Sequence, residues 1–242
     1  MALLATEDVV VRFGGVRALS ETTVSVDPGV VTGLIGPNGA GKTTLFNVIT
    51  GLLDPDAGRV VLDGRDITSY SPFRRARLGI SRTFQKLEAF NSLSARENVL
   101  VAAEQRKAWD RSPYSPLAVT DELLALVGIA EVADYMVGTL PTGTARLVEL
   151  ARALALNPRV LLLDEPSSGL NEEETRAISS LLLRLVADGL AVLLVEHDMS
   201  FVMGTCELIY VLEFGQIIAT GEPERIQSDP AVQAAYLGSV AG

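Results

Sequence analysis

The chain has 242 residues, of which 48% are hydrophobic, and it carries a formal net charge of −10 at pH 7. This length allows one large domain or two modest ones with a hydrophobic core, and the acidic surplus argues against a nucleic-acid-binding protein, which needs a basic stripe. The single cysteine, Cys206, excludes an intramolecular disulfide and a multi-cysteine metal site, and no apolar run reaches the roughly 18 residues that a membrane-spanning helix needs.

The N-terminal region is predicted to form β-strands. Two segments rich in β-branched residues, 9–13 and 22–26, are separated by Gly14-Gly15 and followed by Asp27-Pro28-Gly29, a pattern typical of antiparallel strands. The first residues lack the basic and apolar regions of a secretory signal peptide. We therefore expect a β-rich segment in a protein that stays in the cytoplasm.

The segment Gly36-Pro37-Asn38-Gly39-Ala40-Gly41-Lys42-Thr43-Thr44 matches the pattern of a phosphate-binding loop. The apolar run 30–35 predicts a buried strand before it, and a helix is expected to begin at Lys42. Glycines let backbone amides turn toward an anion, and the N-terminus of a helix attracts phosphate. We predict a nucleoside triphosphate site here, and a glycine-rich turn without a ligand is the weaker interpretation.

A further strand is predicted after the loop helix. Gly51 and Asp54-Pro55-Asp56 end that helix, and residues 59–62 return to a strand pattern. This strand and the N-terminal segments predict a β-rich lobe beside a nucleotide-binding core.

Four arginines form a local basic cluster in an otherwise acidic chain: Arg74, Arg75, Arg77 and Arg82. Such a cluster could meet anionic lipid headgroups or acidic loops of a partner. The simpler interpretation, which we favour, is a helix face exposed to solvent.

Residues 88–157 have the spacing of helices, interrupted by a polar, proline-containing connection at 106–116 that is expected on the surface. A helix is predicted over residues 146–156, with its leucines facing the core, and Asn157-Pro158 ends it. This part of the chain is therefore predicted to be an α-helical insert.

The last third alternates strands and helices. The apolar runs 160–163 and 191–195 predict buried strands, and Asn171 can cap the helix between them. Such alternation predicts a parallel sheet that binds its ligands at the carboxyl ends of the strands. The residues expected at these ends are Gly36, Asp164 and His197.

A series of short motifs accompanies the phosphate-binding loop. In chain order they are Phe13, Arg82-Thr83-Phe84-Gln85, Leu140-Pro141-Thr142-Gly143-Thr144, Leu161-Leu162-Leu163-Asp164-Glu165, Ser167 to Asn171, and Glu196-His197-Asp198. With this ordered set the chain resembles the ATP-binding cassette (ABC) family over essentially its whole length. The resemblance implies an α/β fold: a P-loop NTPase (ABC ATPase) core with a parallel sheet, an N-terminal antiparallel β lobe and an α-helical insert.

The resemblance also implies a single ABC ATPase domain over residues 1–242. Residues 1–87 and 158–242 would form the nucleotide-binding core with its β lobe, and residues 88–157 the helical subdomain. The cofactors implied are ATP and Mg²⁺.

The chemistry of phosphoryl transfer to water explains the residue types, because it needs positioning and charge neutralisation more than covalent help. Lys42 is expected to neutralise the β- and γ-phosphates, and Thr43, Gln85 and Asp164 offer the oxygen ligands that magnesium prefers. Glu165 is expected to orient the attacking water.

Two further roles rest on the resemblance. It places His197, the single histidine of the chain, against the γ-phosphate. The alternative is a histidine in the core or on the surface that has ordinary hydrogen bonds and no role in binding. Phe13 is expected to stack on adenine, although an isolated aromatic residue in a strand is commonly a core residue.

The segment Leu140 to Thr144 departs from the family pattern, Leu-Ser-Gly-Gly-Gln, and matches it at Leu140 and Gly143 alone. In the family this signature loop covers the ATP held by a second subunit. Pro141 has no hydroxyl where the usual serine contacts the γ-phosphate, and losing such a bond costs about 1.5–3 kcal/mol. Thr142 and Thr144 are the candidate replacements. If the partner cassette differs from this chain, the weakened site is the one on the partner's phosphate loop.

Several details resemble the branched-chain amino-acid-type importer cassettes: Arg12-Phe13-Gly14-Gly15, Arg82-Thr83-Phe84-Gln85, Gly169-Leu170-Asn171, Glu196-His197-Asp198-Met199 and Ala235-Tyr236-Leu237-Gly238. Such cassettes work in pairs beneath two membrane permeases, with an extracytoplasmic solute-binding protein. The resemblance therefore implies a peripheral protein at the cytoplasmic face of the cell membrane, with a second cassette, identical or different, as its partner. Lipopolysaccharide export cassettes share the closing Tyr-Leu-Gly, and urea, other small amides and lipids remain open as cargo.

The sequence leaves two other classes of function open. Non-transport cassettes in translation or DNA repair usually carry two cassettes in tandem or long coiled-coil insertions, and 242 residues provide neither. A regulatory module that binds ATP without hydrolysing it fits the altered signature, but the intact Asp164, Glu165 and His197 count against it.

Overall fold

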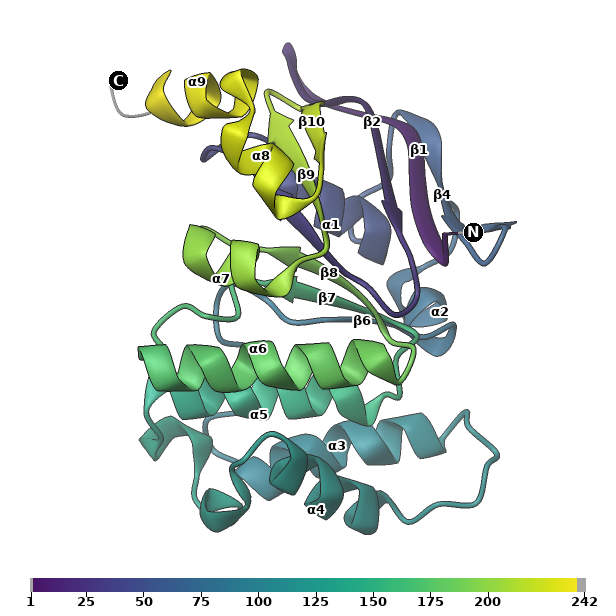
Figure 1. Cartoon of the computed structure of the whole chain (residues 1–242). Coiled ribbons are helices and arrows are strands. Elements are labelled where there is room, and N and C mark those ends of the chain that lie inside the picture. Colours follow the sequence, from purple (N-terminus) through teal and green to yellow (C-terminus); the bar gives the residue numbers. More distant parts are fainter. Residues whose placement is uncertain (1, 239–242) are drawn as a thin grey trace.

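The computed structural model describes residues 2–238 and contains two β-sheets, the larger of which has helices packed on it (Figure 1). The larger sheet has six strands in the order β10-β9-β3-β8-β7-β6. They are β3 (Val31–Ile35), β6 (Ile80–Arg82), β7 (Val160–Asp164), β8 (Ala191–Val195), β9 (Leu208–Glu213) and β10 (Gln216–Gly221). All neighbouring pairs are parallel except β9 with β10, so the predicted parallel sheet of an α/β fold is confirmed.

Both faces of this sheet are covered, which explains why its central strands are apolar throughout. Leu161, Leu163 and Leu194 point to the face covered by helices α5 (Thr142–Ala155) and α6 (Glu172–Ala187). Leu162 and Leu193 point to the opposite face, which is covered by α1 (Lys42–Thr50) and the second sheet (Figure 1). Alternation along each strand thus divides the core into two layers.

The second sheet is the predicted antiparallel β lobe, with the order β2-β1-β4-β5. Its strands are β1 (Leu4–Phe13), β2 (Val16–Val26), β4 (Ala57–Leu62) and β5 (Arg65–Asp66). Strands β1 and β2 both begin earlier than predicted. Leu4 pairs with Val26 on one side and with Leu62 on the other, so long-range pairing extends strands whose local pattern is weak.

The helical insert contains α3 (Ala95–Lys107), α4 (Pro116–Leu126) and α5, which share one hydrophobic core with α6. Capping residues begin two of them: Ser94 forms a capping box with Glu97, and Ser115 accepts the N–H of Ala118. The helix predicted over 146–156 begins four residues earlier than expected, at Thr142, because the carbonyl of Pro141 already accepts the N–H of Ala145. The signature segment is therefore mostly the first turn of a helix.

The remaining helices lie at the edges of the core. They are α2 (Pro72–Arg77), α7 (Met199–Thr205), α8 (Pro223–Ser228) and α9 (Pro230–Gly238), with the short 3₁₀ turns η1 (Ala130–Val132) and η2 (Val137–Thr139). Asn171 caps α6 as predicted and forms a capping box with Glu174. Within residues 2–238, no helix combines the length and the apolar character that crossing a membrane requires.

The predicted solvent-exposed arginine face is correct for Arg74 and Arg77 but wrong for Arg75 and Arg82. Arg75 is buried and donates hydrogen bonds to the carbonyls of Val48 and Ile49 at the C-terminal end of α1, and to those of Thr68 and Tyr70. A cation is favourable at this end of a helix. Arg82 forms a buried ion pair with Asp164.

Cys206 is buried, and burial raises the pKa of its thiol to about 12. A thiol with this pKa is almost entirely protonated at neutral pH, so it is a poor nucleophile and a poor metal ligand. The structure supports a packing role for this residue.

Candidate functional site

The phosphate-binding loop connects the end of β3 to the start of α1. Its glycines adopt backbone conformations that side chains rarely allow, with φ of +151° at Gly36, +79° at Gly39 and +112° at Gly41. A Cβ atom at Gly36 would lie 1.9 Å from the carbonyl oxygen of Leu212, and one at Gly41 would lie 2.5 Å from that of Ala18. The loop therefore needs glycine at both positions for close packing as well as for its φ angles.

Polar groups from three strand ends meet at this loop. A hollow of about 220 Å³ is lined by Asn38 to Thr44, Gln85, Asp164, Glu165 and His197, with Ala18 and Val195. The structure thus brings together the residues predicted for the phosphate and metal site. Phe13 lies at the end of β1, is 54% exposed, and does not line the hollow.

Lys42 is the first residue of α1 and is 7% exposed. Its ammonium group donates hydrogen bonds to the carbonyls of Gly36, at 2.6 Å, and Pro37, at 3.0 Å. Burial lowers the pKa of Lys42, and the carboxylates of Glu165 and Asp164 act in the opposite direction. The ammonium group is therefore held inside the loop that surrounds the hollow.

Glu165 is the centre of a small hydrogen-bond network. Its Oε1 accepts a hydrogen bond from Nε2 of Gln85 at 2.9 Å and lies 3.0 Å from Nε2 of His197. Its backbone has a φ of +51°, which is uncommon for a residue with a side chain. Such strain is typical of positions where function fixes the side-chain direction. Glu165 thus contacts two other predicted site residues, whereas Asp164 pairs with a different residue.

That partner, Arg82, is a site residue that sequence analysis missed. Its NH2 group lies 2.8 Å from Oδ2 of Asp164, and its NH1 group donates to Oδ1 of Asn47 at 2.7 Å. The signal available was a charged residue at the carboxyl end of a parallel strand, the edge of the sheet where ligands bind.

Helix α5 holds the backbone that follows Gln85. Arg146 donates to the carbonyl of Gln85 at 3.0 Å and to that of Ser168 at 2.8 Å. Glu149 accepts the N–H of Glu88, and Arg152 donates to the carbonyl of the same residue at 2.8 Å. Burial raises the pKa of Glu149, whereas the Glu88 N–H and the two arginines lower it. These side chains fix the path of the segment that carries Gln85.

Glu196 is a second residue that sequence analysis did not assign to a structural role. Its buried carboxylate accepts hydrogen bonds from the backbone N–H of Ser167, at 2.8 Å, and of His197, at 2.8 Å. It also accepts from the Ser167 hydroxyl at 2.5 Å and from the N–H of Asp198 at 3.2 Å. One carboxylate therefore joins the loop after β7 to the loop after β8.

The signature segment lies away from the phosphate loop of its own chain, and none of its residues lines the hollow. It packs instead on the segment Ser167 to Asn171 and the start of α6. A Cβ atom at Gly143 would lie 2.6 Å from Cδ2 of Leu170 and 3.3 Å from the carboxylate of Glu174. Thr142 is exposed, whereas Thr144 is half-buried.

The oxygen donors around the hollow suit a hard cation. Thr43 supplies a hydroxyl, Gln85 an amide oxygen and Asp164 a carboxylate, the ligand types that Mg²⁺ prefers. Among residues 2–238, no group of three or more His, Cys, Asp or Glu side chains could hold an ion. This donor set fits Mg²⁺, which is usually bound by one or two carboxylates together with substrate phosphates and water.

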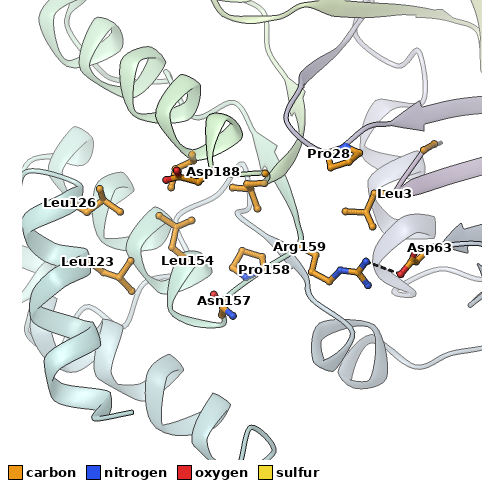
Figure 2. A pocket seen from close by; sticks show the side chains of 14 residues that line it. Leu3, Pro28, Asp63, Leu123, Leu126, Leu154, Asn157, Pro158, Arg159 and Asp188 are labelled. Carbon is orange, nitrogen blue, oxygen red and sulfur yellow. Dashed lines mark hydrogen bonds and ion pairs between the residues drawn. The ribbon is translucent and has the colours of Figure 1, made fainter. Parts of the chain in front are cut away.

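A second hollow, of about 560 Å³, lies near the opposite ends of the parallel strands (Figure 2). Leucines from α4, α5 and the region after α6 line it, and Arg159 forms an ion pair with Asp63 at 2.8 Å on its other side. This hollow contains none of the predicted site residues.

Comparisons with known proteins show which sequences this chain resembles. The family model described as ABC transporter matches residues 19–168, and that described as Branched-chain amino acid ATP-binding cassette transporter matches residues 216–242. Among curated proteins, the chain is 38% identical to the high-affinity branched-chain amino acid transport ATP-binding protein BraF of Pseudomonas aeruginosa, with 98% of each chain covered. It is 36% identical to the lipopolysaccharide export system ATP-binding protein LptB of Haemophilus influenzae, again with 98% of each chain covered.

Solved structures show the same likeness. The ADP conformation of MJ1267, an ATP-binding cassette of an ABC transporter, aligns with a TM-score of 0.87 and 34% identity, covering 98% of this chain and 99% of that one. A dimeric post-hydrolysis state of the cassette MJ0796 bound to ADP and Pi aligns with a TM-score of 0.81 and 25% identity, covering 91% of this chain and 98% of that one.

Proposed function

Because the chain belongs to the ABC transporter family of ATP-binding proteins, we propose that it energises an importer of branched-chain amino acids or a similar small polar solute. The family establishes a nucleotide-binding ATPase subunit of a transporter. The observation that carries the choice of cargo is the match of the C-terminal residues to the branched-chain amino acid cassettes. We also propose that residues 1–87 and 158–242 act as the nucleotide-binding core and residues 88–157 as the helical subdomain.

In this proposal the phosphate loop holds the triphosphate of ATP. Backbone amides of residues 36–44 and the N-terminal end of α1 face the phosphates, and Lys42 neutralises the β- and γ-phosphates. Lys42 must then exchange its bonds with the carbonyls of Gly36 and Pro37 for bonds to phosphate. Phe13, at the exposed end of β1, stacks on adenine.

Hydrolysis requires a water molecule that is aligned with the γ-phosphorus. Glu165 orients this water and receives its proton as the water oxygen bonds to the γ-phosphorus, and the bond from the γ-phosphorus to ADP breaks, so that ADP and phosphate are the products. Gln85 and His197 contact Oε1 of Glu165, which leaves Oε2 for the water. His197 also contacts the γ-phosphate. Thr43, Gln85 and Asp164 would hold Mg²⁺, which would offset the negative charge of the phosphate oxygens.

The signature segment acts on a second subunit. Cassettes of this family work as dimers with membrane permeases, and residues Leu140 to Thr144 lie outside the hollow of their own chain. The N-terminal end of α5, with Thr142 exposed at its first turn, is therefore directed to ATP on the partner's phosphate loop. Helix α5 still presents its positive dipole end there, although Pro141 lacks a hydroxyl.

Replacing Thr142 with alanine is expected to lower the ATPase rate of the assembled complex about tenfold, because one hydrogen bond to a charged phosphate is lost. The matched control is Thr144→Ala, whose half-buried hydroxyl should matter little. Phosphate release and nucleotide-driven dimerisation, followed by size-exclusion chromatography, measure the effect. If Thr142→Ala changes neither, Thr142 does not replace the serine of the family.

The partners proposed are a second cassette, identical or different, two permeases and an extracytoplasmic solute-binding protein. The assembly places this chain peripherally at the cytoplasmic face of the membrane. Lipopolysaccharide export is the second candidate function, because the similarity to LptB covers 98% of both chains.

The test is to tag the chain in its native host, solubilise the membranes gently and identify stoichiometric partners by mass spectrometry. We expect two polytopic proteins and a cassette, and uptake of radiolabelled leucine should fall when the gene is deleted. Partners resembling lipopolysaccharide exporters, with normal leucine uptake, would favour the second candidate. Soluble partners alone would contradict a transport function.

A further inference from the structure

Arg82, at the end of β6, connects two parts of the proposed magnesium site. Its guanidinium group contacts Oδ2 of Asp164, the last residue of β7, at 2.8 Å and Oδ1 of Asn47 in helix α1 at 2.7 Å. These partners lie 82 and 35 residues away in the sequence. The guanidinium therefore forms a bridge between helix α1 and strand β7.

The surroundings of Arg82 fix this bridge in one geometry. The side chains of Arg82 and Asp164 are 5% and 3% exposed. The guanidinium carbon lies 5.1 Å from the ring centre of Phe46 and 4.8 Å from that of Phe84, distances at which cation–π attraction operates. Removing one partner of a buried ion pair leaves the other charge buried and unpaired, and the aromatic rings keep Arg82 from turning away.

The contacts of Arg82 and those expected of Mg²⁺ involve the same two elements, helix α1 and strand β7. Thr43 and Asn47 are four residues apart in α1, so they lie on the same face of the helix, one turn apart. Thr43 and Asp164 are two of the residues that would hold Mg²⁺, and Arg82 connects Asn47 to the same Asp164. Asp164 lines the hollow but Arg82 does not, so Arg82 approaches the carboxylate from outside the hollow and leaves Oδ1 for ligands within it.

We propose that Arg82 is a positioning residue for the magnesium site: it holds the carboxylate of Asp164 at a set distance from the face of α1 that bears Thr43. This inference rests on the proposed ATPase site. Partners that orient metal ligands in this way typically change metal affinity about 10–100-fold when they are removed. Lysine is a poor substitute because a single ammonium group lacks the planar fork that reaches two acceptors.

The test compares the purified full-length chain with the variant Arg82→Met. Binding of a fluorescent ATP analogue is measured in EDTA and then during titration with Mg²⁺, and bound Mn²⁺ is counted by electron paramagnetic resonance. We expect nucleotide affinity in EDTA to change less than about twofold, while the Mg²⁺ concentration for half-maximal response rises about tenfold or more. The Mn²⁺ spectrum of the bound ion should broaden because the carboxylate is no longer held.

Arg75→Met is the matched control, because Arg75 is also buried and also contacts α1 but has no bond to Asp164. It should lower stability and leave the Mg²⁺ requirement unchanged. A normal Mg²⁺ requirement in Arg82→Met, or an equal loss of binding in EDTA, would overturn the proposal. If Arg82→Met does not fold, Arg82→Lys serves the same purpose: an intermediate rise supports the bridge, and an unchanged requirement contradicts it. Failure of the wild-type chain to bind nucleotide would instead contradict the proposed function.

Discussion

Replacing Glu165 with glutamine is expected to reduce steady-state ATP hydrolysis by the assembled transporter at least about a hundredfold, because a neutral amide cannot accept the proton of the attacking water. Glutamine has the same shape and keeps an oxygen that can accept the hydrogen bond from Gln85. Nucleotide affinity should therefore remain within a few-fold of the wild-type value. Phosphate release gives the rate, and equilibrium binding of a fluorescent ATP analogue gives the affinity.

The control for this variant is Glu173→Gln, which removes an exposed carboxylate from the first turn of α6, outside the hollow. It should leave the rate unchanged. Equal turnover of Glu165→Gln and the wild type would exclude Glu165 as the residue that orients water. A loss of nucleotide affinity equal to the loss of rate would instead assign Glu165 to binding.

Gly36→Ala should destabilise the protein by about 3 kcal/mol or more, because the new Cβ atom would overlap the carbonyl oxygen of Leu212, 1.9 Å away. Gly39→Ala is a matched comparison in the same loop: its φ is +79°, but no atom lies within 4 Å of the added Cβ. That variant should lose only the free energy of backbone strain, about 1 kcal/mol. Urea denaturation separates the two effects.

ATP binding by the two glycine variants adds a functional readout. Gly36 begins the phosphate loop where β3 ends, so a displaced backbone there should move the amides that face phosphate, and affinity should fall strongly. Gly39→Ala should retain most of its affinity. If both variants lose similar stability, the close packing of Gly36 on β9 is not what holds the loop.

Local patterns were sufficient to predict much of the fold. Apolar runs identified strands β3, β7 and β8, and the phosphate-loop motif identified the start of α1 at Lys42. Asn171 was identified as the cap of α6. These features depend on residues close together in the sequence, where periodicity, capping and turn chemistry act directly.

What the sequence did not predict depends on contacts between distant residues. Arg75 and Arg82 are indistinguishable from surface arginines until α1 and Asp164 are placed beside them, 26 to 82 residues away in the chain. The early start of α5 was missed because threonine and glycine are weak helix formers. Tertiary packing of Gly143 against Leu170 favours the helical turn instead. The catalytic roles of the site residues, including Phe13, stay predictions.

The carboxylate of Glu196 has a consequence for motion. This carboxylate accepts hydrogen bonds from both Ser167 and His197. If either loop opens alone, the buried carboxylate loses hydrogen-bond donors, which costs several kcal/mol. The two loops should therefore open as one cooperative unit, and their protected amides should exchange with solvent at a common rate. Glu196 thereby couples the loop after β7 to the histidine at the hollow.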